Sequence, residues 1–321
     1  MTTIRRRAFT LVELLATSAI GAIVLGLLFP AIQKVRAVDA RARCENNLKK
    51  LGEGVQGYAA AHEGILPNNG TIQPVAGSDP PMNNIVTPYY SWNIQLLPYI
   101  GHEKTGRAID PRYDWLDVKD SKNAEACSTR VPEFVCAAAP NPDRVVKTHD
   151  TAGGTFGAGV TDYCGVPAAY SHNNNQNNLH AGAMNYRYGS YQIRIKDVGD
   201  GASNTLMIVE MGDKPNGWRA GKLIHDNSDK VHTTTGIGAG QWGAPNWNHI
   251  RSYTFDGTTA FGECAVNCSN GAAIYSFHDG GANTLFVDGS VRFLSHAKTT
   301  QALLIALVST NGGEVLADGD F

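Results

Sequence analysis

The sequence contains 321 residues, of which 42% are hydrophobic and 17% are charged, and it carries a formal net charge of −2. This length is sufficient for a hydrophobic core in one large or two small domains. The slightly acidic balance of 27 basic and 29 acidic residues provides no basic surface for a nucleic acid, so we expect no nucleic-acid partner.

An apolar segment follows three arginines near the N-terminus, with the sequence RRRAFTLVELLATSAIGAIVLGLLFP at residues 5–30. Its apolar part spans about twenty residues, which matches the hydrocarbon thickness of a bilayer. The arginines hold the N-terminus on the cytoplasmic side, so the chain after Pro30 is exported. We therefore predict a single-pass inner-membrane protein with a periplasmic or cell-surface ectodomain. Glu13 would cost about 2.5 to 3.5 kcal/mol near the middle of such a helix, so its presence requires a functional reason.

Residues 8–13, AFTLVE, resemble the processing site of type IV pilins and type II secretion pseudopilins. The resemblance implies that prepilin peptidase cuts between Ala8, where most members have glycine, and Phe9, and that it methylates the new amine. It also implies that Glu13 pairs with the N-terminal amine of a neighbouring subunit, which offsets much of the cost of desolvating both charges. Pro30 lies where many pilins have a helix-loosening proline, so we expect a kink or a melted turn there.

Two other interpretations of this segment stay open. An ordinary signal peptide would be cut after a small-residue motif in the region 16–22, although its apolar core would be shorter and without a buried acid. A plain membrane anchor would undergo no processing. The combination of the arginines with Ala8, Phe9, Glu13 and Pro30 favours the pilin-like interpretation.

The segment 31–62 is predicted to continue the helix with one apolar stripe. Apolar residues recur at spacings of three and four, as in an amphipathic helix: Ile32, Val35, Val38, Ala42, Leu48, Leu51, Val55 and Tyr58. The whole helix would measure about 80 Å, and its second half should pack on the ectodomain. Gly64 and Pro67 are expected to end it. We expect its last turns to be weakened by three glycines, namely Gly52, Gly54 and Gly57.

The remaining residues are predicted to form the ectodomain of an α+β, pilin-like fold, with a mostly antiparallel, β-rich structure. The chain then divides into a basic leader, a transmembrane half-helix, an amphipathic half-helix and the ectodomain, at residues 1–8, 9–30, 31–62 and 63–321.

Local patterns predict several elements of the ectodomain. Ser91 is a candidate N-cap for a short helix over residues 91–101. Alternating or β-branched residues predict strands at 145–149, 186–196 and 205–211. The run NNNQNN, residues 173–178, is expected to be a polar loop.

A hairpin is predicted near the C-terminus, within HDGGANTLFVDGSVRFLS, residues 278–295. Its strands TLFV and SVRFL flank Asp288 and Gly289, a pair typical of tight turns. Nine residues separate His278 from this pair. Together with CENNLKKLGEGVQGYAAAHEGILP, DGASNTLMIVE and LVSTNGGEV, this segment resembles the DUF1559 family of pilin-like proteins, which is abundant in planctomycete bacteria and has a C-terminal H-x9-DG motif. The family has no settled activity.

Six cysteines, an even number beyond an exported segment, predict disulfides. Cys264 and Cys268 could close a small loop. A second loop would join Cys127 to Cys136, and the helix would then be attached through Cys44 and Cys164. Fifteen pairings are possible, and free buried thiols are the alternative. We predict no metal site at these cysteines, because Cys264 and Cys268 have CxxxC spacing and there is no second pair with ligand spacing.

The other candidate site residues have alternative roles. His278 could be a ligand or a binding residue, but we favour a hydrogen bond to the turn backbone. Asp197, Asp200 and Asn204 could bind calcium, although turn or helix-cap roles are favoured because their spacing does not match an EF-hand loop.

We predict a filament subunit and not an enzyme. The pairs beginning at His62 and His102 lack the second histidine of a zinc protease, and no GxSxG motif occurs. The subunit would polymerise through its first helix into a pilus or a type II secretion filament, with prepilin peptidase and other subunits as partners. The alternative is a membrane-anchored solute- or carbohydrate-binding protein that does not polymerise. Trp218, Trp242 and Trp247 could line a sugar-binding face in such a protein, although we expect most of the five tryptophans to be core aromatics.

Overall fold

The computed structural model describes residues 10–73, 84–85, 91–173, 176–184, 187–188, 192–232, 240–245 and 249–314. Within this part of the chain, the fold is a long N-terminal helix and a β-rich, mostly antiparallel ectodomain. The predicted α+β class is therefore confirmed.

Helix α1 extends from Leu11 to Ala61, and Thr10 is its N-cap. The helix continues through Pro30, so the melted turn expected there is wrong, while the kink stays a prediction. Proline removes one backbone hydrogen bond, but the apolar helix formers on both sides keep the helical path. The C-terminal end follows the prediction: Gly64 has a φ of +82°, and its N–H donates to the Ala59 carbonyl at 2.8 Å.

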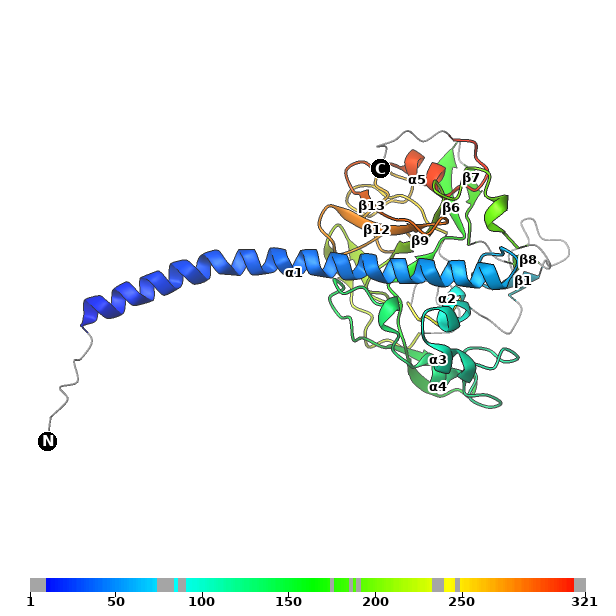
Figure 1. Ribbon diagram of the computed structural model, residues 1–321, viewed down its shortest axis with the longest axis horizontal. Coiled ribbons are helices and arrows are strands. Elements are labelled where there is room, and N and C mark those ends of the chain that lie inside the picture. The colour runs from blue at the N-terminus through cyan, green and yellow to red at the C-terminus, as the bar shows by residue number, and fades with distance from the viewer. Residues whose placement is uncertain are drawn as a thin grey trace.

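The first half of α1 projects alone from the ectodomain, whereas the second half lies between the antiparallel sheet and the small helices (Figure 1). The helix continues through the three glycines of its last turns, and the weakening expected from them stays a prediction. A Cβ atom on Gly52 would lie 2.9 Å from Leu285 Cδ1, and one on Gly54 would lie 2.6 Å from Ile100 Cγ2. These glycines allow the helix to approach the ectodomain closely.

The short helices are α2 (Trp92–Leu96), α3 (Glu103–Ala108), α4 (Asn123–Cys127) and α5 (Gln301–Val308), with 3-10 helices η1 (Leu97–Tyr99), η2 (Pro132–Phe134) and η3 (Ile195–Asp197). The predicted helix after Ser91 is confirmed, because the Ser91 side chain accepts a hydrogen bond from Ile94 N. Trp92 and Leu96 of this helix are fully buried beside α1.

The central sheet has four antiparallel strands in the order β13-β12-β9-β5. Their bounds are Val291–Ser295, Gly281–Phe286, Leu206–Glu210 and Tyr163–Gly165. Strands β9 and β12 are entirely buried, because one sheet face packs on α1 and the other faces a second core that includes α5. The predicted strand at 205–211 and the predicted hairpin are confirmed.

The hairpin turn has the predicted chemistry. Gly289 has a φ of +88°, and Asp288 Oδ1 accepts a hydrogen bond from Ser290 N at 2.8 Å. This is the aspartate turn that the DG pair predicts.

The remaining strands form small sheets around this centre. They are β1 (Thr71–Gln73), β2 (Asn84–Ile85) and β8 (Arg187–Tyr188) in one sheet, and the pairs β3 (Val146–His149) with β4 (Thr155–Ala158), β6 (Ala168–Asn173) with β7 (Gln176–Ala181), and β10 (Gly217–Arg219) with β11 (Lys222–His225). The strand predicted at 145–149 is confirmed.

Two local predictions are wrong. The asparagine-rich run is the end of the β6–β7 hairpin, where His172 pairs with Asn177. Backbone hydrogen bonds form such a hairpin without apolar side chains in this run. The strand predicted at 186–196 is the second. In the described part of this segment, strand β8 has two residues, and the C-terminal end of the segment belongs to helix η3.

Candidate functional site: the N-terminal helix and its buried attachment

The first half of α1 is an apolar surface that is exposed in the described part of the chain. Its large hydrophobic residues from Leu11 to Phe29 are between 48% and 73% exposed. Within α1, an 18-residue window has a mean hydropathy of 2.2 and no buried residues, so the helix is long and apolar enough to cross a membrane. Among the described helices, α1 alone meets this criterion. The predicted membrane anchor is supported by length and composition.

Glu13 lies at the exposed N-terminal end of this surface. Its Oε2 atom accepts hydrogen bonds from Thr10 N and Thr10 Oγ1, both at 2.9 Å, and Glu13 N donates to Thr10 Oγ1 at 3.2 Å. This capping box provides acceptors for the backbone N–H groups of Thr10 and Glu13 within one chain. The predicted processing residues Ala8 and Phe9 lie outside the described residues.

The second half of α1 is attached to the ectodomain by polar contacts along its length. The guanidinium of Arg41 lies 3.5 Å from the ring centroid of Phe293. Asn47 Nδ2 donates to the Val135 carbonyl at 3.0 Å, and Gln56 Nε2 donates to the Val287 carbonyl at 2.9 Å. Residues 30–39 of α1 are still exposed, and these contacts begin at Arg41.

An ion pair adds to this attachment. Lys50 of α1 pairs with Glu133, which also contacts His102 Nε2 through its Oε2 atom at 2.7 Å. Burial alone would raise the pKa of Glu133, but the hydrogen bonds from Lys50 and His102 outweigh burial and lower this pKa below its ordinary value. The carboxylate therefore stays charged at neutral pH.

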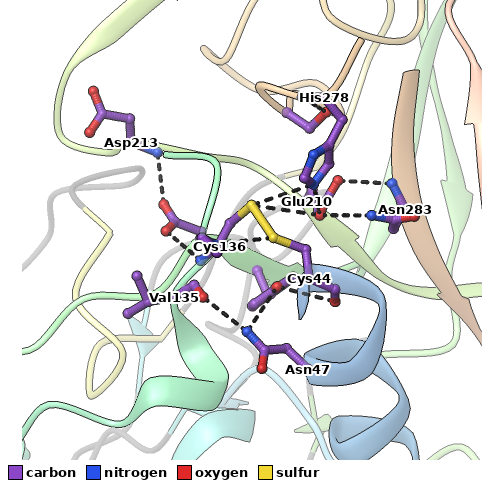
Figure 2. Close-up of a disulfide and its surroundings, with 12 residues drawn as sticks. Cys44, Asn47, Val135, Cys136, Glu210, Asp213, His278 and Asn283 are labelled. Carbon is purple, nitrogen blue, oxygen red and sulfur yellow. Dashed lines mark hydrogen bonds and ion pairs between the residues drawn. A yellow bond between two sulfur atoms is a disulfide. The ribbon is translucent and has the colours of Figure 1, made fainter. Parts of the chain in front are cut away.

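A disulfide between Cys44 and Cys136 joins α1 to the loop after η2 (Figure 2). The possible pairings of Cys127 with Cys136 and of Cys44 with Cys164 are wrong, since Cys44 pairs with Cys136 and the buried residues Cys127 and Cys164 form no disulfide. Successive residues of a strand point to opposite faces of the sheet. On β5, Tyr163 belongs to the core cluster that contains Cys44, whereas Cys164 belongs to the cluster on the other face.

The other two cysteines, Cys264 and Cys268, form the second disulfide, as the short loop predicted. His296 Nδ1 lies 3.7 Å from Cys264 Sγ and 2.7 Å from the Val266 carbonyl oxygen. For the free thiol of Cys127, burial raises the pKa far above its ordinary value, so this thiol is unreactive.

His278 does not bond the hairpin turn, so the favoured hydrogen bond to the turn backbone is wrong. Its Nε2 atom lies 3.2 Å from Glu210 Oε1 and 3.6 Å from Cys136 Sγ, and both side chains of the His278–Glu210 pair are 1% exposed (Figure 2). Asn283 donates to the Glu210 carboxylate through its backbone N at 2.8 Å and through Nδ2 at 3.3 Å. The motif histidine therefore belongs to a buried cluster with Cys44, Cys136 and Glu210, which we call the Cys–His–Glu cluster.

Sequence reasoning did not single out Glu210. The available signal is its position at the end of LMIVE, because a charged residue in a fully buried strand requires a partner. The identity of that partner depends on strand pairing between β9 and β12, which local patterns do not specify.

The calcium candidates are engaged with backbone donors. Both oxygens of the Asp200 carboxylate accept hydrogen bonds, from Gly312 N at 2.7 Å and Gly313 N at 2.8 Å. Asp197 Oδ2 accepts from Arg194 N at 3.1 Å, and Asn204 Nδ2 donates to the Asp200 carbonyl at 3.1 Å. The contacts of Asp197 and Asn204 are local cap and turn roles, whereas the Asp200 carboxylate holds the distant segment at Gly312 and Gly313. A calcium role stays a prediction.

The tryptophans expected on a sugar-binding face do not gather on one. Trp242 is fully buried, and the indole N–H of Trp218 donates to Asp213 Oδ2 at 2.8 Å. Trp247 lies outside the described residues. An open cleft of about 570 Å³ lies elsewhere, and it is lined by Phe255, Asn267, Tyr275, Phe277, His278 and His296 among others.

Comparisons with known proteins agree with this arrangement. The profile of a family described as a protein of unknown function (DUF1559) matches residues 33–298, and the profile of the prokaryotic N-terminal methylation motif matches residues 4–29. No curated protein and no solved structure matches the chain. The methylation profile ends within the exposed part of α1, and the family profile begins within this exposed part and covers the buried part.

Proposed function

The chain belongs to the DUF1559 family and carries a prepilin-type methylation motif, and from this premise we propose that it is a pilin-like subunit that assembles through α1. The motif implies a cleaved N-terminus and processing by a prepilin peptidase. The resulting subunit would enter a pilus or a type II secretion filament. The ectodomain would lie outside the inner membrane and would distinguish one filament from another.

The observation that carries the proposal is the exposed apolar half of α1. Its hydrophobic residues are exposed around the helix: Leu11, Val12, Leu14, Leu15, Ile20, Ile23, Val24, Leu25, Leu27, Leu28 and Phe29. A helix that is apolar on all sides requires lipid or other helices around it. A subunit could use the same surface first in the membrane and then in the core of a filament.

Glu13 would give this assembly its order. In the filament, the carboxylate would accept the N-terminal amine of a neighbouring subunit in place of Thr10. Removal of one partner from a pair of buried charges is expensive, because the other charge is left without compensation. Correct subunit positions would therefore be favoured over shifted ones.

The Glu13→Ala variant tests the proposal in the native host. We expect membrane insertion and leader removal to continue, while the yield of sheared filaments falls at least about 10-fold, because a lost charge pair of this kind corresponds to several kcal/mol. The matched control is Glu53→Ala, which removes an exposed glutamate from the ectodomain half of the same helix. Normal filaments from Glu13→Ala would contradict the role of Glu13.

The second candidate is an anchored binding protein that does not polymerise. The open cleft favours it, because Phe255 is 64% exposed and lies in the lining with Tyr275 and Asn267, a combination of aromatic and polar groups that suits a small polar ligand. Such a protein would form no filaments, and Glu13→Ala would leave its ligand binding unchanged.

A further inference from the structure

Four potential metal ligands meet in the Cys–His–Glu cluster, although they come from distant parts of the chain. Cys44 lies on α1, Cys136 follows η2, Glu210 ends β9 and His278 precedes β12. One ligand atom from each residue lies within 4.8 Å of the other three, and all four residues are at most 6% exposed (Figure 2). The fold thus builds a compact, buried set of two sulfur atoms, one nitrogen and one oxygen.

The spacing of these atoms suits a tetrahedral zinc ion. Zinc binds sulfur at about 2.3 Å and nitrogen or oxygen at about 2.0 to 2.2 Å, which places neighbouring sulfur and nitrogen ligands about 3.6 Å apart, and nitrogen and oxygen about 3.3 Å apart. His278 Nε2 lies 3.6 Å from Cys136 Sγ and 3.2 Å from Glu210 Oε1. The Cys136 Sγ to Glu210 Oε1 distance is 3.9 Å, so a small side-chain shift would complete this face of the tetrahedron.

The surroundings provide support for the ligands. Asn283 holds the Glu210 carboxylate with two hydrogen bonds, and Ala137 N donates to Cys44 Sγ at 3.2 Å, which would stabilise a thiolate. Nδ1 of His278 has no hydrogen-bond partner within the described chain. Within the described chain, no hydrogen bond at Nδ1 therefore selects the tautomer of His278. A metal ion bound to Nε2 would select the tautomer whose Nε2 lone pair faces the cluster.

We propose that the cluster is a redox-controlled zinc site, which binds one Zn²⁺ ion when Cys44 and Cys136 are reduced. Two thiolates and one carboxylate around Zn²⁺ give the site a net charge of −1. The neutral imidazole is the fourth ligand of the tetrahedron. His278 also lines the open cleft, which provides an entry path. The zinc-bound form and the disulfide form are mutually exclusive because both use the two sulfur atoms.

The chemistry of the exchange balances. Every chain is synthesised with cysteine thiols, and zinc binding releases the two thiol protons. Oxidation of the zinc-bound form by a disulfide-exchange partner transfers two electrons to the partner disulfide, forms the Cys44–Cys136 bond and releases the ion. Either form joins α1 to the ectodomain, so the helix stays attached before and after oxidation. This inference does not depend on filament assembly.

Zinc binding by the full chain in detergent tests the proposal. The protein is reduced with a phosphine and dialysed with zinc, and its zinc content is compared with that of the oxidised protein. We expect the reduced chain to hold one additional zinc ion, to melt at a higher temperature with zinc than without it, and to give a tetrahedral sulfur-ligated spectrum with cobalt. His278→Ala and Glu210→Gln should each lower zinc affinity more than about 100-fold, and Asn283→Ala about 10- to 100-fold.

The matched control is His296→Ala, which alters the histidine beside the other cysteine pair and should leave this zinc ion bound. Cys264, Cys268 and His296 form a second set of potential ligands after reduction, so the cobalt spectrum of reduced His296→Ala keeps the test decisive if a cluster variant fails to fold. The proposal is overturned if the reduced chain takes up no zinc, if zinc does not stabilise it, or if folded His278→Ala and Glu210→Gln bind zinc as tightly as the wild type.

Discussion

Leu25 and Leu51 lie in the same helix, yet Leu25 is 68% exposed and Leu51 is fully buried. The helical backbone is continuous between them, so the difference lies in what surrounds each half. From Leu11 to Phe29 the sequence is apolar on all sides and is exposed among the described residues. From Cys44 onward it has one apolar side, which packs in the main core cluster.

This comparison shows how one helix serves two environments. In the ectodomain half, packing, hydrogen bonds and a disulfide fix the position of the helix. In the N-terminal half, the same kind of helix keeps its apolar surface for lipid or for other helices. Identical substitutions in the two halves should therefore have different effects on the ectodomain, and the following pairs test this.

The largest difference is expected for a core leucine. Leu51→Ala should lower the free energy of unfolding of the ectodomain by about 2 to 5 kcal/mol, because it leaves a cavity at a fully buried site. Leu25→Ala should change it by less than about 0.5 kcal/mol. Denaturant unfolding of both full-length variants in detergent measures the two values. Equal effects would show that the two halves do not differ as described.

A glycine pair tests close packing with a smaller effect. Gly54→Ala should destabilise the ectodomain by about 1 to 3 kcal/mol, because the new methyl group would meet Ile100. A Cβ atom on Gly21 would meet nothing within 4 Å, so Gly21→Ala should leave ectodomain unfolding unchanged. The same unfolding experiment compares them, and a stabilised Gly54→Ala variant would show that helix propensity outweighs packing here.

The smallest effect is expected for the ion pair between Lys50 and Glu133. Lys50→Met should cost at most about 1 kcal/mol at neutral pH, because Lys50 is half exposed. The lowered pKa of Glu133 means that the pair adds stability above the ordinary value of 4.5, and that this contribution is lost as the pH falls through the lowered value. The free energy of unfolding of wild type and Lys50→Met is measured at neutral pH and at a pH below the lowered pKa of Glu133. The difference between the two proteins should be smaller at the acidic pH. Lys49→Met is the control, since Lys49 pairs with Glu45 within α1.

Much of this division could be predicted from the sequence. The apolar run, the amphipathic stripe and Gly64 define α1 because they are local signals of hydropathy and backbone conformation. The DG turn and the helix at Ser91 could also be predicted, because their signals lie within a few residues of sequence. The close packing at the glycines of α1 could not be predicted, because it depends on side chains that are distant in the sequence, such as Leu285 and Ile100.

The Cys–His–Glu cluster could not be assembled from the sequence. The separation of Cys44 and Cys136 is 92 residues, and no spacing rule covers ligands on four distant segments. Only the pairing of β9 with β12 and the position of α1 bring Glu210, His278 and Cys44 together. The argument from cysteine spacing against a metal site therefore applied to local motifs alone.

The intact mass and N-terminal sequence of the protein from native membranes test the central claim most directly. If α1 is the assembly helix of a processed pilin-like subunit, the chain begins with methylated Phe9 and lacks residues 1–8. A chain that begins at Met1 would contradict processing and leave a simple anchor. A chain that begins near Ala22 would contradict the membrane assignment, since most of the exposed apolar surface would then be missing from the mature protein.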